Sequence, residues 1–156
     1  MFNFLMRNGH VFRGKLKKEV FDFNTSIEGF RERCEKGASK YSRIPRGITI
    51  KEQFIEGMKS EWIIPEDSKA NKVILYVHGG GYVSGSCGDH RGFVAKFAKN
   101  TGVQNLLYEY RLAPEHSFPA ALEDSVKMYN WLLASGFKPE NILIAGESAG
   151  GGLCLA

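Results

Sequence analysis

The segment Asn141-Ile-Leu-Ile-Ala-Gly-Glu-Ser-Ala-Gly150 decides the fold that the sequence predicts. Its first half is a short apolar run typical of a buried strand, and glycines stand two positions before and after Ser148. This spacing predicts a sharp turn from strand into helix, because the glycines leave room for the neighbouring elements. Ser148 would then adopt a strained backbone conformation that raises its hydroxyl at the end of the sheet.

The same succession of strand, loop and helix recurs upstream of this turn. Apolar runs at 73–77 and 105–110 predict two further strands, and apolar residues at helical spacing predict helices over about 90–100 and from Pro119 to 133. Strands that alternate with helices of this length predict an α/β fold with a mostly parallel, doubly wound sheet.

The chain changes character near Pro45. Just after it, 48–54 and 59–64 alternate like two paired strands joined by a turn at Glu56-Gly57. Before it, an apolar stripe predicts a helix that ends near Gly37. The stripe consists of Val20, Phe23, Ile27, Phe30 and Cys34.

The composition is that of a folded globular protein, since 43% of the 156 residues are hydrophobic and 12% aromatic. This excludes a disordered or collagen-like chain. No run approaches about 18 consecutive apolar residues, so we expect no membrane span, and the first residues lack the pattern of a secretory signal. The three cysteines are an odd number without metal-ligand spacing, which fits a reducing compartment, and we expect a cytoplasmic protein.

The net charge of +4 is unevenly distributed. Residues 1–60 contain 13 Lys and Arg against 7 Asp and Glu, whereas residues 61–156 contain 8 against 10. A basic first part is compatible with binding to nucleic acid or an anionic membrane surface, but the positive residues are scattered and no nucleic-acid motif accompanies them. We therefore expect a solvated face and no nucleic-acid partner.

A second glycine-rich loop, His78-Gly-Gly-Gly-Tyr82, directly follows the predicted strand 73–77. Three consecutive glycines let backbone amides point at a ligand without intervening side chains, as an oxyanion-binding loop requires. The alternatives are a tight turn or a phosphate-binding loop. The chain has none of the glycine patterns typical of phosphate loops, so the oxyanion interpretation is favoured, together with the turn at Ser148.

Four blocks in this order resemble the hormone-sensitive-lipase-like carboxylesterases of the α/β-hydrolase fold: His78–Ser86, Tyr110–His116, Phe118–Asp124 and Gly146–Gly151. The resemblance is dense from about Ile48 onward and loose over the first 45 residues. It implies a helical cap segment over 1–45 and the N-terminal part of a catalytic domain over 46–156. The apolar stripe of the first segment is equally compatible with plain core.

The resemblance also implies the chemistry. Ser148 would be the nucleophile, and the backbone N–H groups of Gly80, Gly81 and Ala149 would form the oxyanion hole. Neither a metal nor a cofactor is implied. The partner would be a small-molecule ester with a short- to medium-length acyl chain.

Further motif residues would support this site. His78 would hydrogen-bond the glycine-rich loop rather than act as a base, and Tyr82 would border the substrate pocket. Glu147 stands where the family more often has Asp, which preserves the charge. The other supporting residues are Gly79, Arg111 and Glu115, of which the last two would brace the loops beneath the site.

The acid and the base of a catalytic triad are missing from this sequence. In α/β-hydrolases both follow the nucleophile along the chain, yet the eight residues after Ser148 contain neither an acidic residue nor a histidine. Without a general base a serine hydroxyl is a poor nucleophile. The sequence therefore predicts the N-terminal part of an esterase, cut short after the Ser148 turn, with the strand 141–145 exposed at an edge.

Three hypotheses follow. The leading one is a serine carboxylesterase that works through an acyl-Ser148 intermediate. The alternative is a catalytically inactive fragment, or one piece of a split esterase whose C-terminal half, with Asp and His, comes from another chain. The least favoured is a surface-binding protein that uses its basic first part.

Overall fold

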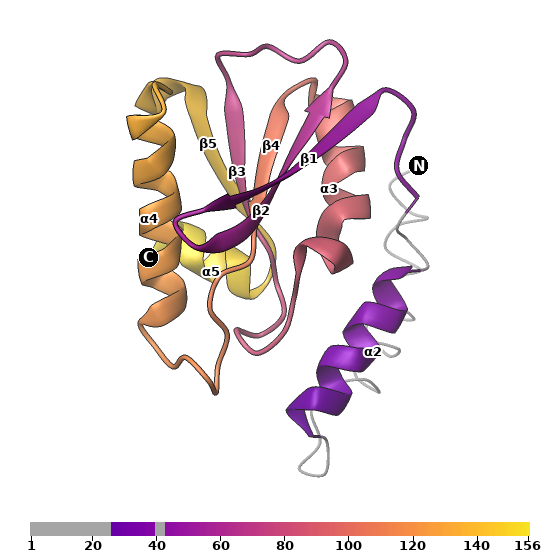
Figure 1. Cartoon of the computed structure of the whole chain (residues 1–156), viewed down its shortest axis with the longest axis vertical. Helices are drawn as coiled ribbons and strands as arrows, with labels where there is room; N and C mark the ends of the chain where they lie inside the picture. Colours follow the sequence, from indigo (N-terminus) through magenta and orange to yellow (C-terminus); the bar gives the residue numbers. More distant parts are fainter. Residues whose placement is uncertain (1–25, 40–42) are drawn as a thin grey trace, which may run out of the picture.

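The computed structural model describes residues 26–39 and 43–156. The described elements, in chain order, are α2 (Ile27–Ser39), β1 (Ile48–Ile55), β2 (Met58–Pro65), β3 (Val73–Val77), α3 (Cys87–Thr101), β4 (Gln104–Tyr108), α4 (Ala120–Ala134), the 3₁₀ turn η1 (Pro139–Asn141), β5 (Ile142–Gly146) and α5 (Ala149–Leu155). They form one sheet with helices on both faces, and α2 lies below α3 in the view of Figure 1, beyond the end of the sheet.

The sheet has five strands in the order β1-β2-β4-β3-β5. The parallel arrangement predicted from the sequence holds for β3 with β4 and for β3 with β5. The other two pairings, β1 with β2 and β2 with β4, are antiparallel, so the sheet is mixed rather than mostly parallel. The two-residue turn at Glu56 and Gly57, with positive φ angles of 52° and 80°, makes β1 and β2 a hairpin, and β2 then joins the parallel strands through β4.

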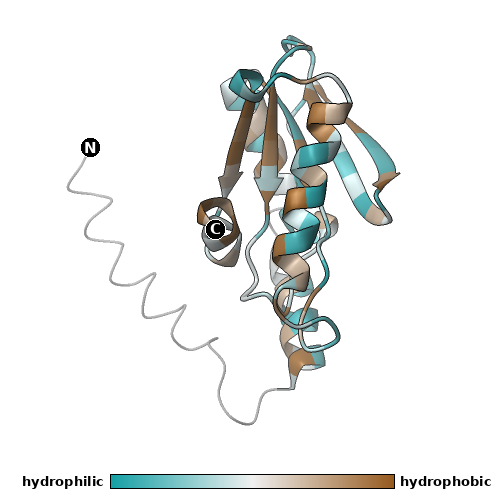
Figure 2. Ribbon diagram, turned by 90° about the vertical axis from the view of Figure 1, so that its left-hand side faces the viewer, coloured by the Kyte–Doolittle hydropathy of each residue, from teal (hydrophilic) through white to brown (hydrophobic). Residues whose placement is uncertain are grey.

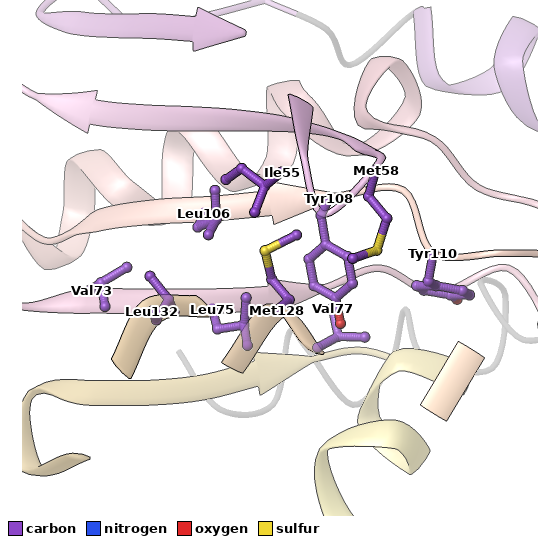
Figure 3. Packing of buried hydrophobic residues seen from close by; sticks show 10 residues of the cluster. All are labelled: Ile55, Met58, Val73, Leu75, Val77, Leu106, Tyr108, Tyr110, Met128 and Leu132. Carbon is purple, nitrogen blue, oxygen red and sulfur yellow. The ribbon is translucent and has the colours of Figure 1, made fainter. Parts of the chain in front are cut away.

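The core lies on both faces of β3, because its successive side chains point to opposite sides of the sheet. On one face, Leu75 packs with Tyr108 of β4 and with Met128 and Leu132 of α4 (Figure 3). On the other face, Tyr76 packs against α3 through the cluster Cys87, Val94, Ala95 and Ala98. The predicted burial of this strand on both faces is confirmed, since all five of its residues are buried.

The predicted elements are found, and their ends differ by a few residues. Helix α3 begins at Cys87 because the Ser86 hydroxyl accepts a hydrogen bond from the Asp89 amide, at 3.1 Å. It ends at Gly102, which has a left-handed conformation. Helix α2 continues past Gly37 to Ser39, so Gly37 does not end it. The predicted start of that helix, at Val20 and Phe23, lies outside the described residues.

Strand β5 stands at one edge of the described sheet, as the sequence predicted. Two of its apolar side chains reach solvent: Leu143 is 57% exposed and Ile144 is 39% exposed. Figure 2 shows this apolar strand at one side of the sheet, near the likewise apolar α5. An unpaired apolar edge is a template for pairing with another strand. Among the described helices, none has the length and apolar character needed to cross a membrane.

The exposed edge makes a testable prediction. Leu143→Lys should reduce concentration-dependent self-association in sedimentation velocity, because a charge on an edge strand opposes strand pairing. Since Leu143 is more than half exposed, the free energy of unfolding should change by only about 0.5 kcal/mol. The matched control is Val126→Lys, which removes a 50% exposed apolar side chain from α4. An equal effect of both variants would show that general surface hydrophobicity, and not the edge, causes the association.

Candidate active site

The Ser148 turn, residues 146–150, joins β5 directly to α5. Ser148 has φ 53° and ψ −120°, a conformation that non-glycine residues adopt at a cost. The glycines on either side are required by space. A Cβ on Gly150 would lie 2.1 Å from the carbonyl oxygen of Val77, and one on Gly146 would lie 2.7 Å from the same atom. The end of β3 and the start of α5 are therefore in direct contact beneath Ser148.

The glycine loop, residues 78–82, follows β3 and packs against the Ser148 turn. A Cβ on Gly79 would lie only 3.3 Å from the Cβ of Ser148. Gly80 and Gly81 both have positive φ, 124° and 65°, and a Cβ on Gly80 would collide with the Ser84 carbonyl at 2.1 Å. The loop can take this path only with glycine at these positions. Ala149, buried at the first position of α5, completes the set of backbone amides predicted for the oxyanion hole.

Glu147 connects the glycine loop to the Ser148 turn. Its Oε1 accepts a hydrogen bond from the Gly79 amide at 2.8 Å, and its Oε2 accepts one from the Tyr76 hydroxyl at 2.5 Å. His90 Nε2 of α3 lies 3.0 Å from Oε1. Burial disfavours the carboxylate, but hydrogen bonds from His90, Tyr76 and Gly79 outweigh it, so the pKa of Glu147 is below its ordinary value. The side chain is a charged link between three elements.

His78 is fully buried at the base of the glycine loop. Its ring stacks on Tyr110 at a centroid distance of 4.1 Å, and its Nδ1 lies 2.8 Å from the Gly79 carbonyl oxygen. Because a carbonyl oxygen only accepts, Nδ1 must carry the proton. Burial lowers the pKa of His78 to about 4, so the ring is neutral at physiological pH. These contacts are those of a ring that supports the loop.

Arg111 and Glu115 hold the segment that follows β4. The backbone amide and the guanidinium of Arg111 both donate to the buried carboxylate of Asp124 on α4. Glu115 accepts two hydrogen bonds from Arg31 of α2, each of 2.8 Å. Arg31 also donates to the Val83 carbonyl at 2.7 Å, just beyond the glycine loop. Sequence reasoning missed Arg31, because nothing local in the sequence connects it to Glu115.

Ser148 opens into a cavity of about 590 Å³. The glycine loop, the Ser148 turn and α2 all line this cavity, and α2 contributes Phe30 and Cys34. Tyr82, expected at the substrate pocket, lines a second, more apolar cavity of about 450 Å³, together with Phe118 and Leu122. Of the stripe residues that the structure describes, Phe30 and Cys34 line the Ser148 cavity, and neither belongs to the two core clusters.

No described histidine forms a hydrogen bond with the Ser148 hydroxyl. Of the three histidines in the described part, His78 supports the loop, His90 contacts Glu147, and His116 is exposed. Nor do the described residues contain a group of three or more His, Cys, Asp or Glu side chains suited to a metal ion. Among the described residues, the site therefore presents a strained serine beside a glycine-rich loop, with no histidine bonded to the serine hydroxyl.

Comparison with known proteins identifies the family to which this fold and site belong. A family model described as "alpha/beta hydrolase fold" matches residues 74–156. The crystal structure of an esterase from the bacterial hormone-sensitive lipase family superimposes with a TM-score of 0.81 at 36% identity, over 90% of this chain and 47% of that one. The chain belongs to the hormone-sensitive-lipase family of α/β-hydrolases. The family resemblance of the four sequence blocks is confirmed.

Relatives in this family are longer than the chain. An esterase of Acinetobacter venetianus is 36% identical over 109 residues, which are 70% of this chain and 36% of the relative. The hormone-sensitive lipase of Mus musculus is 35% identical over 91 residues, 56% of this chain and 12% of the relative. The chain thus spans about half of the solved family structure and about a third of the bacterial relative.

The contact of Arg31 on α2 with Glu115 and Val83 leads to a second prediction. Arg31→Ala should speed hydrogen exchange of the α2 amides, because it removes the donors that hold the helix to Glu115 and Val83. The hydrogen bond from Arg31 lowers the pKa of Glu115 from 4.5 to about 2. A depressed folded-state pKa stabilises the contact above the unfolded value, so the protection of the α2 amides, measured against their intrinsic exchange rate at each pH, should fall as the pH falls from 4.5 toward 2.

The matched control is Arg33→Ala, an exposed position on the same helix. If that variant speeds exchange as much as Arg31→Ala does, helix propensity rather than the contact with Glu115 accounts for the change.

Proposed function

We propose that this chain carries the nucleophile and the oxyanion hole of a serine carboxylic-ester hydrolase that acts on short- to medium-chain acyl esters. The observation that supports it most is the close approach of the glycine loop to the Ser148 turn, with a Gly79 Cβ position 3.3 Å from the Ser148 Cβ. This close approach supports the proposal, because acyl transfer requires backbone amides near the hydroxyl that attacks. The chemistry needs no metal or cofactor.

In the proposed reaction, Ser148 Oγ attacks the ester carbonyl carbon and passes its proton to a general base. The N–H groups of Gly80, Gly81 and Ala149 stabilise the negative charge on the carbonyl oxygen. Collapse of the tetrahedral intermediate expels the alcohol, which takes up the proton, and leaves acyl-Ser148. Water then hydrolyses this ester. The base and its acidic partner would come from residues outside these 156, since the family places both after the nucleophile.

The second candidate is an inactive fragment or one piece of a split esterase. The exposed edge of β5 favours it, because this strand pairs only with β3 in the described sheet and carries the exposed apolar side chains Leu143 and Ile144. A polypeptide that added the next strand there would also be the natural source of the missing acid and base.

The test is hydrolysis of p-nitrophenyl acetate and butyrate by the purified chain, alone and with the C-terminal half of a family esterase added. Ser148→Ala should abolish turnover, and Ser135→Ala, an exposed serine at the end of α4, should leave it unchanged. Turnover that requires the added half supports the split enzyme. Hydrolysis that is insensitive to Ser148→Ala, or its absence with and without the added half, would overturn the esterase proposal.

A further inference from the structure

His90 is the one histidine in the described residues whose two ring nitrogens both face acceptors. Its Nε2 lies 3.0 Å from Glu147 Oε1, and its Nδ1 lies 3.2 Å from the backbone carbonyl oxygen of Ser86. Neither acceptor has a proton to give, so two N–H groups are needed to satisfy both contacts. Only the imidazolium form carries two. The geometry therefore selects a charged His90 beside a charged Glu147.

The oxygen that His90 contacts is the one that holds the glycine loop. Glu147 Oε1 also accepts the hydrogen bond of the Gly79 amide at 2.8 Å, while the Tyr76 hydroxyl occupies Oε2. A carboxylate fixed at both oxygens has little freedom to rotate. A change at His90 is thus transmitted through one atom to Gly79, which directly precedes the proposed oxyanion donors Gly80 and Gly81.

We propose that His90 is a positioning residue that, as an imidazolium held between Ser86 and Glu147, keeps the glycine loop seated against the Ser148 turn. This rests on the proposed function for its catalytic meaning. The seating of the loop is a property of the fold that can be measured without turnover.

The electrostatic surroundings of His90 support a charged ring. Burial disfavours the imidazolium, but the hydrogen bond and the charge of Glu147 outweigh burial, and the pKa of His90 is above its ordinary value. The titratable and charged side chains around the ring come from four segments: Glu147 at the turn, Asp89 on α3, His78 after β3, and Arg33, Cys34 and Lys36 across the cavity on α2. Glu147 is the anion in direct contact.

The contact between His90 and Glu147 should depend on pH. A raised folded-state pKa means that the interaction stabilises the fold fully below the unfolded value, about 6.5 for histidine, and that this contribution is lost as the pH rises through the folded-state pKa. Loss of the proton removes one of the two ring donors. The Gly79 amide should then respond to the same titration as the His90 ring.

The test is NMR titration of the ¹⁵N-labelled chain. We expect both ring nitrogens of His90 to be protonated at pH 6, a midpoint above about 6.5, and the amide resonances of Gly79, Gly80 and Gly81 to shift with that same midpoint. His90→Ala should shift these amides and remove their pH dependence. His90→Gln, which keeps a donor toward Glu147 without the charge, should restore their positions but not the titration.

Asn100→Ala, an exposed substitution on the same helix, is the control and should leave the three amides unchanged. If His90→Ala does not fold, the wild-type titration decides alone. A neutral His90 ring at pH 6, or glycine amides that do not follow its titration, would overturn the proposal.

An activity measurement separates this proposal from the proposed function. Where Ser148-dependent hydrolysis is measurable, His90→Ala should lower kcat about tenfold with little change in KM, because loop placement affects the transition state more than substrate binding. A chain without such hydrolysis would count against the esterase function, whereas the titration would still decide the role of His90.

Discussion

Gly150→Ala is expected to lower the free energy of unfolding by about 3 kcal/mol, one of the largest effects of a single methyl group in this chain. The added Cβ would lie 2.1 Å from the Val77 carbonyl oxygen and 2.6 Å from that of His78. Both are backbone atoms at the end of β3, so no side-chain rotation relieves the overlap. Either α5 or the glycine loop must move, and each movement separates Ser148 from the loop amides.

The neighbouring residue supplies a matched control. A Cβ on Gly151, in the same helix, would meet nothing closer than the Gly146 carbonyl oxygen at 3.5 Å, an ordinary contact. Gly151→Ala should therefore stabilise the helix by up to about 1 kcal/mol, since alanine loses less backbone entropy than glycine. Urea unfolding followed by the fluorescence of Trp62 and Trp131 measures both variants. Equal destabilisation would mean that helix α5, and not its contact with β3, is intolerant of alanine.

The parts of the fold that depend on short segments were predictable from the sequence. The apolar run 73–77 specifies a strand buried on both faces, and Glu56-Gly57 specifies a tight hairpin, because each signal lies within a few residues. The Ser148 turn is similar: its two glycines are where a strand and a helix meet without room for a side chain. Each of these constraints involves only a few consecutive residues, so the sequence is enough to predict it.

The parts of the fold that depend on contacts between residues far apart in the sequence were not predictable. The antiparallel pairing of β2 with β4 makes the sheet mixed. The residues of these two strands do not indicate which strand each one pairs with. Arg31 and Glu115 are 84 residues apart, and His90 meets Glu147 across the top of the sheet. Charged residues of this kind usually read as solvated surface, so only the tertiary structure identifies them as contacts.

Arg91→Met should lower the free energy of unfolding by about 3 to 5 kcal/mol, because it leaves a buried carboxylate without its cation. Glu61 of β2 is completely buried. Arg91 of α3 donates to both of its oxygens, through Nε at 2.8 Å and through a second guanidinium nitrogen. The pair joins α3 to the sheet one residue after His90, so the variant should also disturb the contact between His90 and Glu147.

A double variant distinguishes lost attraction from an unpaired charge. If the cost comes from the uncompensated carboxylate of Glu61, then Glu61→Gln combined with Arg91→Met should recover most of it, because no charge remains to be buried. If the ion pair itself stabilises the fold by that amount, the double variant should be as unstable as Arg91→Met alone. Urea unfolding of the wild type, both single variants and the double variant completes the thermodynamic cycle. We expect recovery, because desolvation of a buried carboxylate outweighs the attraction of one partly exposed arginine.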